Sequence, residues 1–190
     1  MNKSSQNLLL IISGKNELKF EDTWENIYKF IHKLFDNRFK QFRFKLLHRI
    51  IPSKVNLYIW KISTSNLCNV CLVKESYQHQ FIDCKTIEDF WSKLIAIFKK
   101  CGISTNIKNL KNIVIGYKTN TENYNDINII FTIVGFSIFK SYYASECRSK
   151  PIDTFNIFKY EFNNSYNFLL NHHDFPITFL KLFWIFLNNP

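Results

Sequence analysis

The sequence has few of the residues that tight turns and phosphate-binding loops require. Only four Gly and four Pro occur among 190 residues, which argues against a glycine-rich phosphate loop and against the many turns of a β-sandwich. Acidic residues are also scarce, since 15 Asp and Glu face 25 Lys and Arg and leave a formal net charge of +10. This imbalance indicates an anionic partner, either nucleic acid or an acidic membrane. Because 46% of the residues are hydrophobic and 17% aromatic, we expect a sizeable core and a mainly α fold.

The apolar runs at the two ends of the sequence are short as well. The first apolar run, Leu8 to Ile12, is too short for a secretion signal. The last, Phe175 to Leu187, is interrupted by a proline and a lysine and falls short of the ~20 residues that a membrane-spanning helix requires. We therefore expect an intracellular protein, nuclear or cytoplasmic or both, without a membrane partner. In a reducing compartment, five cysteines favour metal ligands or free thiols over disulfides.

Apolar residues recur every three or four positions in several stretches, which is the spacing of amphipathic helices. These stretches are residues 24–50, 55–62, 88–100, 127–143 and 155–169, of which 127–143 is almost continuously apolar and predicts a buried helix. The first predicts one long helix or two shorter ones, with Asp22 or Thr23 as the N-cap. The third ends at Gly102, a residue that commonly terminates helices. The last two stretches predict a helical hairpin.

Three cysteines and one histidine have the spacing of a metal site. Cys68 and Cys71 form a C-x2-C pair, and His79 and Cys84 complete a C-x2-C-x7-H-x4-C pattern. Three thiolates and one imidazole match the ligand number and softness that tetrahedral zinc prefers. Because no fifth ligand is nearby, the site is expected to be closed, which is typical of structural zinc.

Other interpretations of these residues stay open on the sequence alone. The C-x2-C pair could be a redox pair, although the βαβ setting of such pairs is absent, or the cysteines could be core thiols beside an unrelated histidine. Glu75 and Asp83 are candidates to support the ligands without coordinating. We interpret Cys101 and Cys147 as small buried hydrophobic residues.

Positive charge is concentrated in one segment. Residues 29–61 contain nine Lys or Arg and a single acid, Asp36, for a net charge of +8. A merely solvated helix face would normally mix both signs, so we interpret this segment as a phosphate-binding surface with occasional base contacts. The candidate nucleic-acid-binding residues are Lys40, Arg43, Lys45, His48, Arg49, Lys54 and Tyr58.

The order of these features resembles a known family. A basic run from Gln41 to Pro52 is followed by Trp60, the C-x2-C pair, Glu75, the histidine, the last cysteine and Phe90-Trp91. This order resembles the zinc-binding segment downstream of the reverse transcriptase domain in LINE-type (non-LTR) retrotransposons. The tail is similar too, because an apolar helix containing residues 139–143 precedes residues 148–151 and a final helix. The resemblance covers roughly residues 20–172 and leaves out the Phe-rich end after Asp174.

The resemblance implies nucleic-acid binding during target-primed reverse transcription, with an RNA template or the target DNA as ligand. It also implies structural zinc on Cys68, Cys71, His79 and Cys84, and a polymerase domain of the parent element as a partner where one is present. The adjacent Asp-Asp pair of polymerases does not occur in the sequence. The one nuclease-like match is Asp83-Cys84-Lys85, whose middle residue is the proposed fourth zinc ligand. We therefore expect a non-catalytic fragment; the alternative is a domesticated zinc-stabilised scaffold that binds protein.

The patterns together predict a mainly α fold, stapled by a small CCHC zinc knuckle and followed by a C-terminal helical hairpin. The predicted organisation is an N-terminal extension over 1–20, a basic helical zinc-binding domain over 21–103, a connector over 104–125 and a C-terminal helical segment over 126–190.

Overall fold

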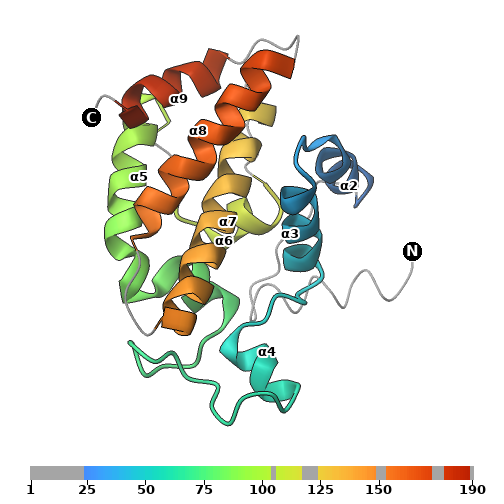
Figure 1. Ribbon diagram of the computed structural model, residues 1–190, viewed down its shortest axis with the longest axis vertical. Coiled ribbons are helices and arrows are strands. Elements are labelled where there is room, and N and C mark those ends of the chain that lie inside the picture. The colour runs from blue at the N-terminus through green and yellow to red at the C-terminus, as the bar shows by residue number, and fades with distance from the viewer. Residues whose placement is uncertain (1–23, 104–105, 117–123, 149–152, 173–177, 189–190) are drawn as a thin grey trace. The chain divides into compact units, whose positions relative to one another are not determined.

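The computed structural model describes residues 24–103, 106–116, 124–148, 153–172 and 178–188 (Figure 1). The described residues are mainly helical, which confirms the predicted fold class, and their only β-type pairing is one isolated bridge between Leu67 and Lys74. The chain forms two compact units, residues 1–33 and residues 34–190. The predicted caps Asp22 and Thr23 lie outside the described residues, and the domain boundaries stay predictions.

The helical stretch predicted over residues 24–50 is two helices, α2 (Trp24–Lys33) in the first unit and α3 (Asn37–Leu47) in the second. α3 begins after Asp36, whose carboxylate accepts a hydrogen bond from the backbone N–H of Arg38. The other elements are α4 (Lys54–Ile59), the π-helix η1 (His79–Asp83), the 3-10 helix η2 (Lys85–Ile87), α5 (Glu88–Lys100), α6 (Leu110–Val114), α7 (Tyr124–Arg148), α8 (Thr154–His172) and α9 (Thr178–Asn188). The helix predicted over 88–100 and the hairpin of α7 and α8 are confirmed.

Helices α5, α7, α8 and α9 build the core of the second unit. α7 packs along α8, α5 contacts α8 and α9, and α3 and α6 pack on α7. Figure 1 shows α5, α7 and α8 side by side, with α9 across one end and α4 at the opposite end. At Gly135 of α7, an added Cβ would lie 2.7 Å from Ile113 of α6 and 3.1 Å from the ring of Phe42 of α3. The missing side chain therefore lets α3 and α6 pack directly on α7.

Within the described residues, α7 is the one helix whose length and composition would suit a membrane span, over Asn125–Ala144. However, 67% of the window is buried inside the protein, and α3, α6, α8 and α9 all contact this helix. A buried core helix passes the same test of length and composition, and a buried helix is what the continuous apolar pattern predicts for this stretch.

The Phe-rich residues after Asp174, which fall outside the resemblance, contribute to the core. Phe183 of α9 is fully buried, and its ring centroid lies 5.2 Å from that of Phe98 in α5 and 5.0 Å from that of Phe162 in α8. Phe98 in turn stacks on Phe131 of α7 at 5.6 Å. Side chains from all four core helices thus meet at one aromatic cluster.

Truncation of this cluster should be costly. We expect Phe183→Ala to lower the free energy of unfolding by about 3–5 kcal/mol, the usual cost of removing a buried phenylalanine ring. Ile185→Ala on the same helix should cost less than about 1 kcal/mol, because Ile185 is 41% exposed. Chemical denaturation measures both variants, and equal losses would contradict the central role of Phe183.

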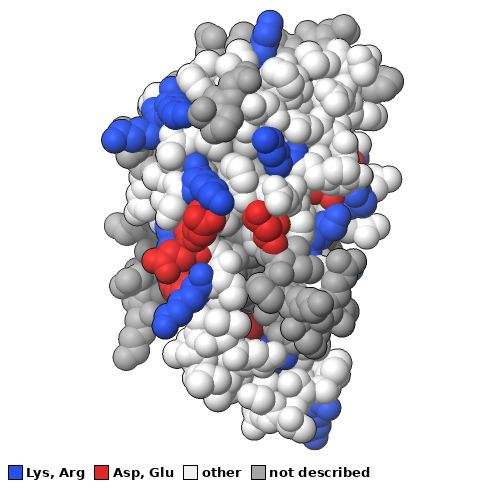
Figure 2. Space-filling model, turned by 60° about the vertical axis from the view of Figure 1, so that its left-hand side comes forward, with Lys and Arg blue, Asp and Glu red and all other residues white. Residues whose placement is uncertain are grey.

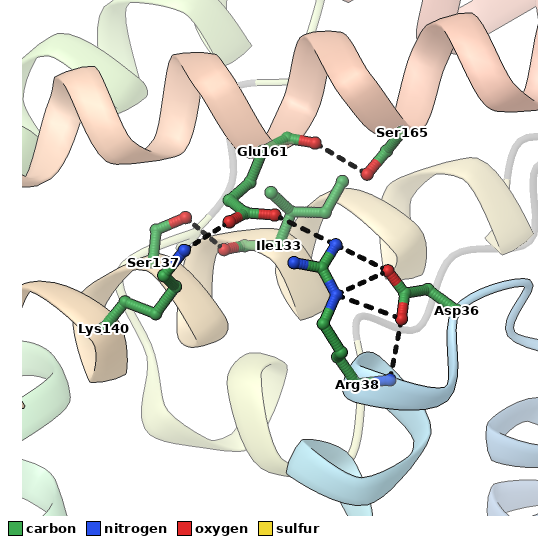
Figure 3. Close-up of polar contacts among 7 residues, drawn as sticks. All are labelled: Asp36, Arg38, Ile133, Ser137, Lys140, Glu161 and Ser165. Carbon is green, nitrogen blue, oxygen red and sulfur yellow. Dashed lines mark hydrogen bonds and ion pairs between the residues drawn. The ribbon is translucent and has the colours of Figure 1, made fainter.

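A buried carboxylate links α8 to α3 and α7 (Figure 3). The side chain of Glu161 is fully buried, with one oxygen 2.7 Å from Lys140 Nζ and the other 3.5 Å from Arg38 Nη2. Arg38 also pairs with Asp36 at 2.7 Å. Two cations of this basic chain, one of them inside the basic segment, are therefore paired with carboxylates of the same chain.

The two ends of the Lys140–Glu161 pair should respond differently to mutation. Lys140→Met leaves a buried carboxylate with only the longer contact to Arg38, so we expect a loss of about 3 kcal/mol. Glu161→Gln leaves Lys140 and Arg38 with exposed side chains that water can solvate, so we expect a loss of about 1 kcal/mol. Denaturation midpoints measure both losses of stability. A larger loss for Glu161→Gln than for Lys140→Met would show that the buried carboxylate does not depend on its pairing with Lys140.

Candidate metal centre and nucleic-acid interface

The structure brings the four predicted ligands together. Cys68, Cys71, His79 and Cys84 each offer one ligand atom, and these atoms lie within 4.8 Å of one another. Cys68 and Cys84 are buried, His79 is 7% exposed, and Cys71 is partly exposed. These cysteines are free thiols, so the cluster is not a disulfide site.

The geometry fits a tetrahedral ion. Cys84 Sγ lies 3.9 Å from Cys68 Sγ and 3.8 Å from Cys71 Sγ. Zinc–sulfur bonds of about 2.3 Å in a tetrahedron place the sulfurs about 3.8 Å apart. The Nε2 atom of His79 is buried without a hydrogen-bond partner, a state that coordination to a metal would relieve. The residues present therefore match a Cys3His zinc site in number, chemistry and spacing.

Burial shifts the pKa values of two residues of the cluster, His79 and Cys84. It lowers the pKa of His79, so the imidazole is neutral near pH 7, which is the form that binds a metal. Burial raises the pKa of Cys84 to about 12, and a contact with Thr86 only partly opposes this shift. Without a cation this thiol keeps its proton, so metal binding and deprotonation of Cys84 are coupled.

A π-turn accounts for the H-x4-C spacing. In η1 the backbone N–H of Cys84 donates to the carbonyl of His79 at 2.8 Å, the i to i+5 bond that defines a π-helix. In a regular α-helix two residues five positions apart point to different sides. The wider π-turn places the imidazole and the thiol on the same side, and the side chain of Ser76 accepts a hydrogen bond from the His79 N–H at 3.2 Å.

The C-x2-C pair lies in a tight loop that is tied to α4. The Cys68 N–H donates to Val73 O and the Leu72 N–H donates to Cys68 O, which closes the knuckle. Glu75 follows and is 1% exposed; its Oε1 accepts a hydrogen bond of 2.8 Å from the Lys54 N–H at the start of α4. Glu75 thus fixes α4 to the loop, whereas Asp83 is exposed.

The last ligand directs α5 into the core. Cys84 precedes η2 and α5 directly, and the indole N–H of Trp91 donates to Phe81 O in η1 at 2.9 Å. Trp91 is 1% exposed, and its neighbour Phe90 packs on Phe158 of α8. A metal on the cluster would therefore hold the knuckle against the helix that joins it to the core.

The candidate nucleic-acid residues divide into two groups. Lys45 and Tyr58 are exposed and Lys40, His48, Arg49 and Lys54 are half-buried, so each of these six reaches the surface. On the exposed side of α3, the ring of Phe44, which is 45% exposed, lies 4.3 Å from that of His48. Phe44 was not among the candidate residues, although its spacing of four positions from His48 indicated that the two rings share a face of the helix.

The prediction that Arg43 contacts phosphate is wrong. Its side chain is 0% exposed, and Nη1 donates to the carbonyl of Ile113 in α6. Arg43 lies three or four positions from Phe39, Leu46 and Leu47, which form the buried side of α3. Its guanidinium therefore joins α3 to α6 in the interior.

Arg49 has a structural constraint of its own. It follows α3 with φ of +56°, and its N–H donates to Leu46 O while the Ile50 N–H donates to Lys45 O, the pattern of a Schellman helix end. The Asn56 amide holds the following turn by donating to the carbonyls of Arg49 and Ile51. Burial lowers the pKa of the Arg49 guanidinium.

One comparison with known proteins bears on this region. Residues 10–91 match the model of a protein family described as zinc-binding in reverse transcriptase. Neither the curated proteins nor the solved structures contain a match to the chain. The matched range covers less than half of the 190 residues but includes all four cluster residues and the basic segment. Residues 10–91 are thus similar to a reverse-transcriptase-associated zinc-binding segment.

Proposed function

We propose that this protein is a non-catalytic, zinc-stabilised nucleic-acid-binding module related to LINE-type reverse transcriptases. Cys68, Cys71, His79 and Cys84 would hold one structural zinc ion. The basic surface of α3, α4 and their connection would bind an RNA template or target DNA during target-primed reverse transcription. A polymerase domain of the parent element is the expected partner, and the site of action is the nucleus, the cytoplasm or both.

The observation that carries this proposal is the set of accessible cations on or beside α3 and α4, the second of which is tied to the metal-binding knuckle. Lys40, Lys45, Arg49 and Lys54 reach the surface on or beside α3 and α4. Glu75 connects the start of α4 to the knuckle, so the metal cluster and this cationic surface belong to one locally fixed structure. Phosphate contacts from such side chains supply affinity that is largely independent of sequence.

Exposed aromatic rings on or beside α3 and α4 suit contacts with bases. Phe44 and His48 form a ring pair on the exposed side of α3, and Tyr58 is 50% exposed in α4. Rings of this kind stack on unpaired bases, whereas the bases of a duplex are already stacked on one another. We therefore expect single-stranded or flapped nucleic acid to bind more tightly than an intact duplex.

The test is equilibrium binding of zinc-loaded protein to single-stranded RNA, duplex DNA and flapped DNA over a range of salt concentrations. Salt-dependent binding with a preference for single-stranded or flapped ligands is the expected result. Negligible affinity for all three ligands would contradict the proposal and favour the alternative, a zinc-stabilised scaffold that binds protein.

A further inference from the structure

The surface next to the metal cluster carries a group of aliphatic side chains that the fold does not bury. They begin at the last residue of α4 and continue through the knuckle, and we refer to them as the apolar tip: Ile59, Ile62, Leu67, Val70, Leu72 and Val73. Their exposed fractions range from 41% for Leu67 to 73% for Leu72. Single exposed hydrophobic residues are normal, but six within 15 residues of sequence mark an interaction surface.

Local hydrogen bonds hold the tip in this outward arrangement. The Ile62 N–H donates to Leu57 O and ends α4, and the bond from Cys68 N–H to Val73 O closes the knuckle. Between these stretches, Ser63 Oγ donates to Ser65 O at 2.8 Å in a compact turn. α4 and the loop that follows it lie at the end of the second unit opposite α9 in Figure 1. The segments that carry the two halves of the tip therefore lie at the same end of this unit.

The chemistry of the tip favours a protein partner. Trp60 is 43% exposed among the residues of the tip and is the one aromatic ring of this stretch. The six branched aliphatic side chains of the tip have no π face and no hydrogen-bonding group, so they match neither nucleobases nor phosphates. Lys61 and Lys74 are interspersed among them, together with polar residues such as Asn66 and Asn69. Apolar contacts mixed with polar groups are typical of protein interfaces, whereas a surface that enters lipid would have to place both lysines at the headgroups.

The charges at the tip define that partner further. Between residues 55 and 82 the charged residues are Lys61, Lys74 and Glu75, and Glu75 is 1% exposed. The exposed charge of the tip is thus entirely positive, and Figure 2 shows the same lower end as mainly uncharged with isolated basic side chains. A second copy of the chain would bring lysines against lysines. Carboxylates on the partner would complement them.

We propose that the apolar tip docks an apolar segment of another protein that carries acidic residues on its flanks. The aliphatic side chains bury the apolar residues of the segment, and Lys61 and Lys74 pair with its carboxylates. This interaction uses none of the seven candidate nucleic-acid-binding residues, although Lys61 is the last residue of the basic segment.

The test is selection of a displayed library of random peptides on the zinc-loaded full chain, followed by affinity measurements on a synthetic peptide of the enriched sequence. We expect enrichment of Leu, Ile or Phe flanked by Asp or Glu. Ile59→Ser, Ile62→Ser and Leu72→Ser combined should weaken the peptide at least tenfold while zinc content is retained. The matched control combines Leu170→Ser, Leu182→Ser and Ile185→Ser, which are exposed residues of α8 and α9, and should leave the affinity unchanged.

Charge reversal gives a second readout that nonspecific hydrophobic binding would not produce. Lys61→Glu with Lys74→Glu should weaken the acid-flanked peptide at least tenfold and strengthen a version with Lys in place of its acids. The proposal is overturned if no enriched peptide depends on the tip, or if the control triple variant loses as much affinity. It is also overturned if the tip binds phosphatidylserine–phosphatidylcholine vesicles and no peptide. Unchanged binding of single-stranded RNA by the tip variants would show that the two surfaces act separately.

Discussion

Removal of the metal should lower Tm by about 10 °C. The reference is protein purified without chelator, which should hold about one zinc per chain. The ligands lie together only in the folded chain, so metal binding is linked to folding. At a free metal concentration a thousandfold above Kd, this linkage contributes about 4 kcal/mol. A domain of this size gains about 2–4 °C in Tm for each kcal/mol. Metal analysis and differential scanning calorimetry measure the two quantities.

Single substitutions separate the ligands from the other cysteines. Cys68→Ser and Cys84→Ala should each abolish stoichiometric zinc and lower Tm to near that of the chelated protein. Cys101→Ala is the matched control, because Cys101 is half-buried outside the cluster, and it should keep its zinc. Zinc retained by Cys84→Ala would remove Cys84 from the site, and an unchanged Tm after chelation would show that the metal does not stabilise the fold.

The logarithm of the affinity for single-stranded RNA should fall with the logarithm of the salt concentration at a slope of about −3. This value follows from about four phosphate contacts, at roughly 0.7 displaced counterions each on a single strand. Lys40, Lys45, Arg49 and Lys54 supply the four accessible cations. Replacing the three lysines together by Ala should flatten the slope by about two units and weaken binding similarly for unrelated sequences.

Two controls make this test specific. Lys99→Ala, Lys100→Ala and Lys181→Ala combined remove the same net charge from exposed positions of α5 and α9 and should change the slope little. Arg43→Met should leave the slope unchanged but lower the free energy of unfolding by about 2 kcal/mol, because it removes an internal hydrogen bond of a charged group. Equal flattening by both triple variants would mean that net charge, and not this surface, governs binding.

The apolar periodicity of the sequence predicted most of the helices. It could also have corrected the assignment of Arg43 to phosphate binding. The apolar pattern located α5, α7 and α8 to within a few residues, because each buries a continuous side against the others. The same pattern places Arg43 on the side of α3 that carries Phe39 and Leu46, both buried. Counting charge over the whole segment concealed this placement, since a count does not distinguish the two sides of a helix.

Other features depend on contacts that spacing alone does not reveal. The H-x4-C pattern identified two candidate ligands, but not the π-turn that points them the same way. Glu75 was a candidate to support the ligands, but its hydrogen bond to a backbone N–H 21 residues earlier in the chain could not be read from the spacing. The part played by Phe183 is visible only once α9 lies against three other helices.

The short span of the metal cluster also bears on how the chain reaches its fold. Cys68 and Cys84 are 16 positions apart in the sequence, whereas Phe98 and Phe183 are 85 positions apart. Loop-closure entropy rises with the logarithm of loop length, so the first encounter costs about 1.5 kcal/mol less than the second. In the unfolded chain the thiols therefore meet more often than the rings do. The knuckle can close while the aromatic core is still open, and α5 then starts from a fixed end.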